Sequence, residues 1–198
     1  LDQLGGGVFA GPQRIAFGQG SLKQTDQPLD VALTREDEFF AVRTTDGDTG
    51  EQSVRLTRNG QFSLNAANEL VTQQGHPVLS TDEEPIIIPA GSKPQIGPTG
   101  GILINGEPIA QLQVARVANT EALQKMGENL FDFEGSDPRE IIDDPLLNPG
   151  MIELSGADPI RTLMSVIDAS KSAMSNANMM RYHDLLMDRA VNTLGSVA

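Results

Sequence analysis

Residues 160–194 read IRTLMSVIDASKSAMSNANMMRYHDLLMDRAVNTL and contain neither glycine nor proline. Asp158 and Pro159 directly precede this run. They suit a helix start, because an Asp side chain accepts orphan N–H bonds and Pro fits the first turn. Gly195 stands where a helix stop belongs. The sequence therefore predicts one helix over 159–195, roughly 50 Å long at about 1.5 Å per residue.

Nine residues of this run, spaced by three, four or seven positions, form one apolar stripe, which we call the assembly stripe. They are Ile160, Leu163, Ile167, Met174, Ala177, Met180, Met187, Val191 and Leu194. A helix buried in a monomeric core would show a similar pattern. However, no second long helix is predicted from these residues, and the many methionines and small residues favour close, adjustable helix packing. We expect the stripe to pack on another chain or on a segment that precedes Leu1.

The residues before the helix predict an all-β body over 28–133. Short apolar runs with a two-residue period are separated there by turns rich in Gly and Pro. Their spacing fits an irregular sandwich or barrel. Asn59-Gly60 is the favoured hairpin dipeptide and predicts a hairpin, whereas Glu121–Met126 predicts one or two helical turns.

Two further segments flank this body. Residues 1–27 are rich in Gly, Gln and Ser with isolated apolar side chains, which predicts an extended segment laid over another surface. Residues 134–158 are rich in Pro, Gly and Asp, which predicts a linker before the helix. The fold class expected is mainly β with a long C-terminal helix.

Charge and composition exclude several functions. The chain has 198 residues and a formal net charge of −13; residues 159–198 carry +1, which leaves −14 on residues 1–158. Nucleic acid or an anionic membrane would be repelled. The absence of cysteine excludes disulfide and thiolate chemistry. Leu1–Gly5 resembles neither a signal peptide nor a natural start, so we expect a trimmed N-terminus.

Candidate catalytic and metal-ligating residues are few. His76 lies in a predicted turn, and His183 lies among methionines on the helix, so packing or exposure explains both. Asp46, Asp48 and Glu51 loosely resemble a calcium loop but lack its third ligand and its distant Glu.

Two further patterns have ordinary explanations. Gly97–Gly101 lacks the Lys-Ser/Thr of a phosphate-binding loop, and a hairpin turn explains it. Asp82–Glu84 and Asp143-Asp144 are expected to be solvated. We predict no enzyme activity, no cofactor and no metal.

Two segments form recognisable motifs, a GSL…T…PLD…FF pattern and a TR-N-G-x-F segment. Their residues are Gly20, Ser21, Leu22, Thr25, Pro28, Leu29, Asp30, Phe39, Phe40, Thr57, Arg58, Asn59, Gly60 and Phe62. These motifs resemble those of the bacterial flagellar rod and hook proteins, and the matches follow the family's order along nearly the whole chain. One departure is the charged run Arg35–Glu38, which stands where the family usually has glycines before the Phe pair.

The resemblance implies a structural subunit of the flagellar basal-body rod that polymerises into a helical tube. Such a tube transmits torque from the motor to the hook and forms part of the export channel. Its partners are then copies of itself and neighbouring rod or hook subunits. The location implied is the periplasmic rod, reached by type III export without a cleavable signal peptide. The family's N-terminal helix, expected upstream of Leu1, packs with the C-terminal helix into a coiled-coil core near the tube axis.

The shared motifs do not separate proximal rod, distal rod and hook-type members. An alternative function from another class is a secreted or periplasmic ligand-binding β module that dimerises through its C-terminal helix. Filaments would favour the rod subunit, and a closed dimer that binds a ligand would favour the module.

Overall fold

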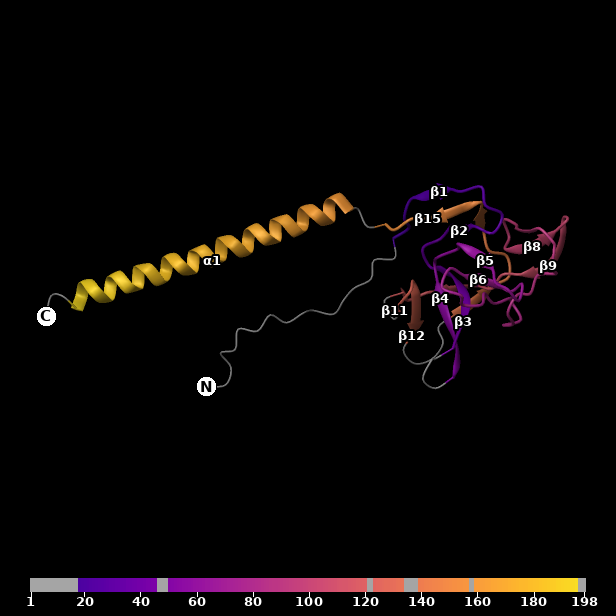
Figure 1. The fold of residues 1–198 in the computed structure, drawn as a ribbon, viewed down its shortest axis with the longest axis horizontal. Helices are drawn as coiled ribbons and strands as arrows, with labels where there is room; N and C mark the ends of the chain where they lie inside the picture. The colour runs from indigo at the N-terminus through magenta and orange to yellow at the C-terminus, as the bar shows by residue number, and fades with distance from the viewer. Residues whose placement is uncertain (1–17, 46–49, 121–122, 134–138, 157–158, 196–198) are drawn as a thin grey trace. The chain divides into compact units, whose positions relative to one another are not determined.

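The structure, a computed structural model, describes residues 18–45, 50–120, 123–133, 139–156 and 159–195 (Figure 1). These residues belong to two compact units, one ending at Gly156 and one beginning at Ala157. The first unit is the β body, and the second contains the helix. The predicted fold class, mainly β with a long C-terminal helix, is confirmed.

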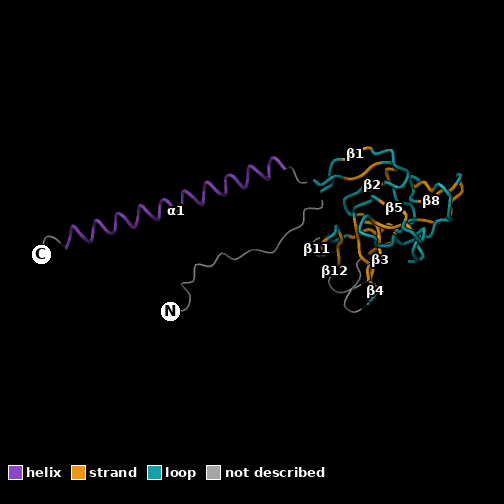
Figure 2. The backbone as a smooth tube through the Cα atoms, viewed as in Figure 1, coloured by secondary structure: helices purple, strands orange, loops and turns teal. Residues whose placement is uncertain are grey.

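The body is built from fifteen described strands that form several small sheets (Figure 2). Their bounds are β1 Leu22–Gln24, β2 Val31–Leu33, β3 Glu38–Thr45, β4 Gln52–Thr57, β5 Phe62–Leu64, β6 Leu70–Thr72, β7 Pro94–Ile96, β8 Gly101–Ile104, β9 Glu107–Gln111, β10 Val114–Val117, β11 Leu123–Gly127, β12 Leu130–Phe133, β13 Arg139–Ile142, β14 Leu147–Pro149 and β15 Met151–Glu153.

The largest sheet has six strands in the order β11-β12-β4-β3-β10-β13. A three-stranded sheet has the order β7-β8-β9, and three pairs complete the body, namely β1-β15, β14-β2 and β5-β6. All described pairings are antiparallel. None of these sheets closes on itself within the described strands, so the body is an irregular assembly of open sheets and not a barrel.

Side chains on the two faces of the six-stranded sheet form separate cores, because successive residues of a strand point to opposite faces. The larger core is contributed by many strands and includes Val31, Leu33, Phe40, Val42, Phe62, Leu70, Ile88, Ile102, Leu112 and Val114. The smaller core contains Phe39, Leu56, Ala115, Val117, Leu123 and Phe131.

The structure corrects the predicted linker at 134–158. Within it, β13 extends the six-stranded sheet along β10, β14 pairs with β2, and β15 pairs with β1. The partners lie up to about 130 positions away in the sequence, and burial of Leu147 holds this segment to the body. Residues 134–138 and 157–158 lie outside the described residues.

Two local predictions are also wrong. Leu123–Gly127 forms β11 and not a helical turn, because Leu123 enters the smaller core and the strand pairs with β12; Glu121 and Ala122 are not described. Asn59-Gly60 does not close a hairpin, because β4 before it pairs with β3 and β12 whereas β5 after it pairs with β6. The predicted hairpin at Gly97–Gly101 is confirmed as the β7–β8 turn, in which the amide of Gly97 bonds the carbonyl of Gly101 at 2.8 Å.

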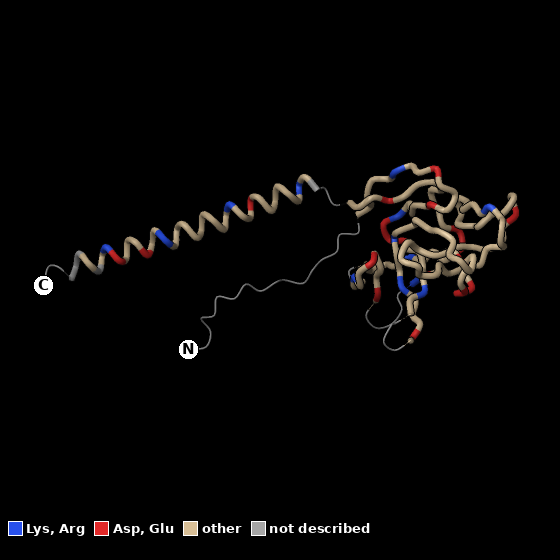
Figure 3. The backbone as a smooth tube through the Cα atoms, viewed as in Figure 1, with Lys and Arg blue, Asp and Glu red and all other residues tan. Residues whose placement is uncertain are grey.

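The helix α1 spans Pro159–Gly195, as the sequence predicts. Its 37 residues make a helix of roughly 55 Å at about 1.5 Å per residue. Charged residues are sparse along it (Figure 3). No described helix has the length and apolar character needed to cross a membrane.

Candidate assembly site

The assembly stripe on α1 carries large apolar side chains that are exposed. The exposed fractions range from 44% at Ile167 to 70% at Ile160 and Met180. Ala177 is exposed as well, whereas the side chains of Val191 and Leu194 lie outside the described residues. Water disfavours exposed apolar surface of this extent, and such surface is typical of interaction sites.

The exposed apolar surface of α1 is wider than the predicted stripe. Six further large side chains on the helix are 49–70% exposed. They are Met164, Val166, Met179, Tyr182, Leu185 and Leu186. Four of them lie within 179–186, so the second half of the helix presents apolar side chains on more than one face. The narrow periodicity used to define the stripe missed them.

The first family motif forms the edge at which β1 and β15 pair. Leu22 lies opposite Glu153, the amide of Leu154 bonds the carbonyl of Ser21 at 2.9 Å, and the amide of Thr25 bonds the carbonyl of Gly150 at 2.8 Å. A Cβ at Gly20 would lie 1.8 Å from the Leu154 carbonyl oxygen. Glycine at position 20 is therefore required for this pairing.

The PLD motif and the Phe pair hold the middle of the body. The carbonyl of Pro28 accepts the amide of Ile96, and the carbonyl of Asp30 accepts the amide of Gly150 at 2.8 Å. Leu29 packs partly buried against the larger core. The rings of Phe40 and Phe62 meet edge to face, with centroids 5.2 Å apart, so two separate motif positions touch.

The segment Thr57–Gly60 is a tight turn between two sheets. The Thr57 hydroxyl accepts the amide of Asn59, and the Asn59 side-chain oxygen accepts the amide of Gln61, both at 3.1 Å. A Cβ at Gly60 would lie 1.7 Å from the carbonyl oxygen of Val31. These contacts explain why the motif has small and hydrogen-bonding residues at these positions.

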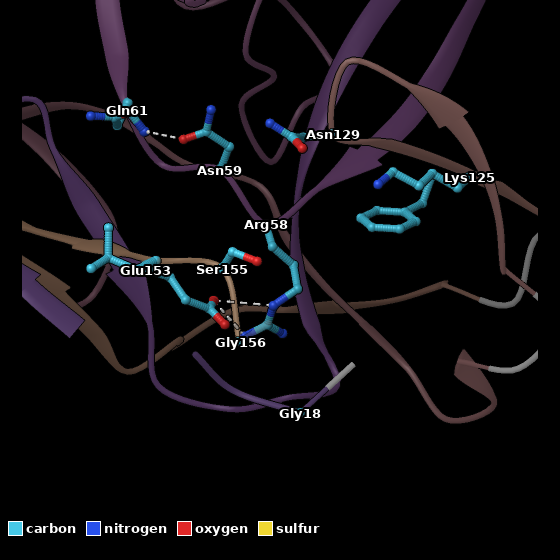
Figure 4. Close-up of a pocket in the computed structure, with 11 residues that line it drawn as sticks. Gly18, Arg58, Asn59, Gln61, Lys125, Asn129, Glu153, Ser155 and Gly156 are labelled. Atoms are coloured by element: carbon cyan, nitrogen blue, oxygen red, sulfur yellow. Dashed lines mark hydrogen bonds and ion pairs between the residues drawn. The ribbon is translucent and has the colours of Figure 1, made fainter. Parts of the chain in front are cut away.

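Arg58 points from this turn toward Glu153 at the end of β15 (Figure 4). Its Nη2 and Nε donate to Glu153 Oε2 at 2.7 and 3.1 Å. Both side chains are mostly buried, with 12% and 10% exposed. Sequence reasoning assigned Arg58 to the family motif but gave it no partner.

A cavity of about 380 Å³ lies beside this ion pair and is lined by both polar and apolar groups, among them Asn59, Lys125, Phe131 and Ser155 (Figure 4). Catalysis requires a nucleophile, or an acid and a base, held at hydrogen-bond distance from a reacting group. The carboxylate on this wall is already bound to Arg58. The ion pair therefore forms part of the wall of this cavity.

The charged run that replaces the family glycines forms an ion network with Arg116 on β10. Arg35 contacts Asp37 and Glu38 at 3.1 and 3.6 Å, and Arg116 contacts the same two carboxylates at 3.4 and 3.2 Å. The hydrogen bond from Arg35 is the main cause that lowers the pKa of Asp37 below its usual value, with burial acting in the opposite direction. The same hydrogen bond raises the pKa of Arg35.

The candidate reactive residues are not brought together. His76 Nε2 lies 2.9 Å from Glu128 Oε2, and His183 is exposed on α1. Asp82–Glu84 and Asp143-Asp144 lie exposed on the body. Asp46 and Asp48 of the loose calcium pattern lie outside the described residues, and the described part of the chain contains no group of three metal-ligating side chains.

Comparison of the sequence with known proteins identifies its family. The sequence pattern of the flagellar hook protein FlgE/F/G D1 domain matches residues 35–104. The flagellar hook-basal body complex protein FlhO of Bacillus subtilis (strain 168) is 31% identical over an alignment of 208 positions. The alignment covers 96% of this chain and 74% of that protein.

Two similar proteins are named as rod proteins. The flagellar basal-body rod protein FlgF of Mesorhizobium japonicum is 28% identical over 190 residues, with 94% of this chain and 76% of that protein covered. The flagellar basal-body rod protein FlgG of Buchnera aphidicola subsp. Schizaphis graminum is 28% identical over 199 residues, with 94% and 73% covered. This chain belongs to the family of flagellar hook and basal-body rod proteins.

Proposed function

We propose that this protein is a structural subunit of the flagellar basal-body rod and that it polymerises into a helical tube. Family membership supports a structural role, because the similar proteins are named as rod and hook-basal body proteins. The observation that carries the proposal is α1, a helix of 37 residues whose described side chains expose an extended apolar surface.

The helices of neighbouring subunits pack through the assembly stripe into a coiled-coil core. Apolar residues at spacings of three and four allow such packing, and Ala177 lets two helix backbones approach closely. Contacts of this kind are heterologous and do not close, so each added subunit offers the same surface to the next. The β bodies contact one another around the core and carry torque from motor to hook.

The core of such a tube surrounds the channel through which flagellar proteins are exported. The partners are copies of this chain and neighbouring rod or hook subunits, and the location is the periplasmic rod of the basal body. The chain itself is exported through that channel. The near-neutral helix and the strongly acidic remainder suit this arrangement, because the helix is buried in the assembly while the body is solvated.

The substitution Ala177→Asp tests the proposal in the source bacterium. A carboxylate in the stripe should block rod assembly and abolish motility, because a buried unpaired charge is costly. Ala169→Asp is the matched control: it makes the same Ala→Asp change, with the same change in helix propensity, at an exposed position on the face of α1 opposite Ile167 and Met174. Normal rods and motility with Ala177→Asp, or equal defects in both variants, would contradict the proposal.

A further inference from the structure

Arg58 uses every nitrogen of its guanidinium group. Nε and Nη2 bind Glu153, whereas Nη1 donates to the carbonyl oxygens of Arg35, Glu36 and Glu38 at 3.1, 2.7 and 3.2 Å. Its guanidinium carbon also lies 5.7 Å from the centroid of the Phe39 ring. One side chain therefore joins the end of β15 to the loop before β3 and to the smaller core.

Glu153 occupies the point where the chain enters and leaves the body. It is the last residue of β15, it lies opposite Leu22 of β1, and its second oxygen accepts the amide of Gly20 at 2.9 Å. The paired strands run from this point toward Asp26 and Gly150, where the amide of Asp26 bonds the carbonyl of Gly150. We call β1 and β15 together the terminal strand pair.

A force that separates the two ends of the body reaches the Gly20–Glu153 end of this pair first. An antiparallel strand pair pulled from one end opens one hydrogen bond at a time. Each backbone hydrogen bond by itself adds little resistance to this opening. Arg58 adds a second connection at that end, because it ties Glu153 to groups outside the pair. The ion pair is mostly buried, so solvent and salt screen it less than a surface pair.

We propose that Arg58 and Glu153 form a latch that fastens the terminal strand pair to the core of the body, so that force entering at either end is delivered to the core. The force-transmitting role rests on the proposed function as a rod subunit. The latch itself is a property of the body and is measurable on the isolated chain.

Hydrogen exchange of the purified chain tests the latch. In Arg58→Lys the charge is kept, but the planar fork that reaches both Glu153 and the carbonyl oxygens is lost. The amides of Gly20 and Leu154 should exchange about tenfold faster or more, while those of Ala41 and Leu56 change less than about twofold. Unchanged exchange at Gly20 and Leu154, or an equal increase at all four amides, would overturn the latch.

Arg55→Lys is the matched control. Arg55 lies in β4, close to Arg58 in sequence, and pairs with Asp132 of β12 at 2.8 Å, a contact that does not involve the terminal strand pair. Arg55→Lys should leave the exchange rates of the Gly20 and Leu154 amides unchanged. An increase there equal to that in Arg58→Lys would count against a specific role of Arg58.

A second variant tests whether the two residues act as one device. Glu153→Gln keeps an oxygen for the amide of Gly20 but removes the charge. Added to Arg58→Lys, it should speed exchange at Leu154 by less than about twofold, because the latch is already open. A fully multiplicative effect of the two substitutions would show independent roles and would overturn the proposal.

Mechanical unfolding gives an independent readout. The chain has no cysteine, so Gly18→Cys and Lys171→Cys supply two unique attachment points. In the chain with native Arg58, the terminal strand pair should stay closed until the body unfolds. In Arg58→Lys, an earlier and weaker extension should appear as the terminal strands separate. Identical traces would contradict the latch and would leave the result for Ala177→Asp untouched, so the two proposals fail separately.

Discussion

Phe39 and Phe40 follow one another in β3 but belong to different cores. The Phe39 ring meets Phe131 edge to face with centroids 5.8 Å apart, and the Phe40 ring meets Phe62 on the opposite face of the sheet at 5.2 Å. Both side chains are fully buried. A two-residue motif therefore anchors both faces of the six-stranded sheet.

Separate cores predict independent effects of Phe39→Leu and Phe40→Leu. Each substitution should lower the free energy of unfolding by about 1–2 kcal/mol, because part of a buried ring is lost. In the double variant the two losses should add to within about 0.5 kcal/mol, since the two rings pack in different cores. Urea unfolding followed by circular dichroism measures this, and a clear departure from additivity would show that the cores are coupled.

Gly60→Ala should destabilise the body by at least about 2 kcal/mol. The added Cβ would lie 1.7 Å from a backbone carbonyl oxygen, which cannot move aside as a flexible side chain would. Gly18→Ala is the control, because its Cβ would meet nothing within 4 Å, and it should cost less than about 0.5 kcal/mol. Equal urea midpoints for the two variants would refute the close approach of Gly60 and Val31.

Arg116→Ala should cost about 3 kcal/mol of stability, because it leaves the Glu38 carboxylate, only 2% exposed, with a weaker partner. Arg35→Ala should cost less than about 1 kcal/mol, since Arg35 is 55% exposed and its ion pairs are screened. Replacing Glu38 and Arg116 together by methionine should recover most of the loss. If the double variant is as unstable as Arg116→Ala, the buried charge is not the cause.

The lowered pKa of Asp37 leads us to expect that the fold loses stability in acid. Its pKa is lower in the folded chain, mainly because Arg35 donates a hydrogen bond to the carboxylate. The resulting stabilisation is complete above the ordinary Asp pKa of about 3.9 and disappears as the pH falls through the lowered folded pKa. The native chain should therefore lose more stability than Asp37→Asn between about pH 5 and about pH 3.

The measurement is the urea midpoint at the two pH values. Asp82→Asn, in an exposed turn, serves as the control and should retain the native pH dependence. If Asp37→Asn shows the same acid dependence as the native chain, the interaction with Arg35 does not stabilise the fold.

Local patterns predicted the elements whose stability is local. The helix followed from a long run without glycine or proline, and the strand-rich body followed from short apolar runs separated by turns rich in Gly and Pro. The motif glycines at positions 20 and 60 could be identified by resemblance. Their physical reason, a close approach to a carbonyl oxygen, appeared only with the partner strands in place.

The strands in 139–153 could not be predicted from their own residues. They are three or four residues long and interrupted by Asp and Pro, and their partners Leu22, Val31 and Val114 lie far away in the sequence. The partner of Arg58 was hidden for the same reason, since 95 positions separate it from Glu153. Tertiary pairing, which short windows do not contain, decides such elements.

The pairing of β1 with β15 brings the entrance and the exit of the body side by side. A module connected in this way behaves as an insertion between two neighbouring points of a longer chain, and insertions of this kind are well tolerated. Evolution can therefore enlarge, trim or exchange the strands between Gln24 and Met151 while the sequences on either side keep their spacing. One terminal scaffold can thus carry bodies of different size and surface.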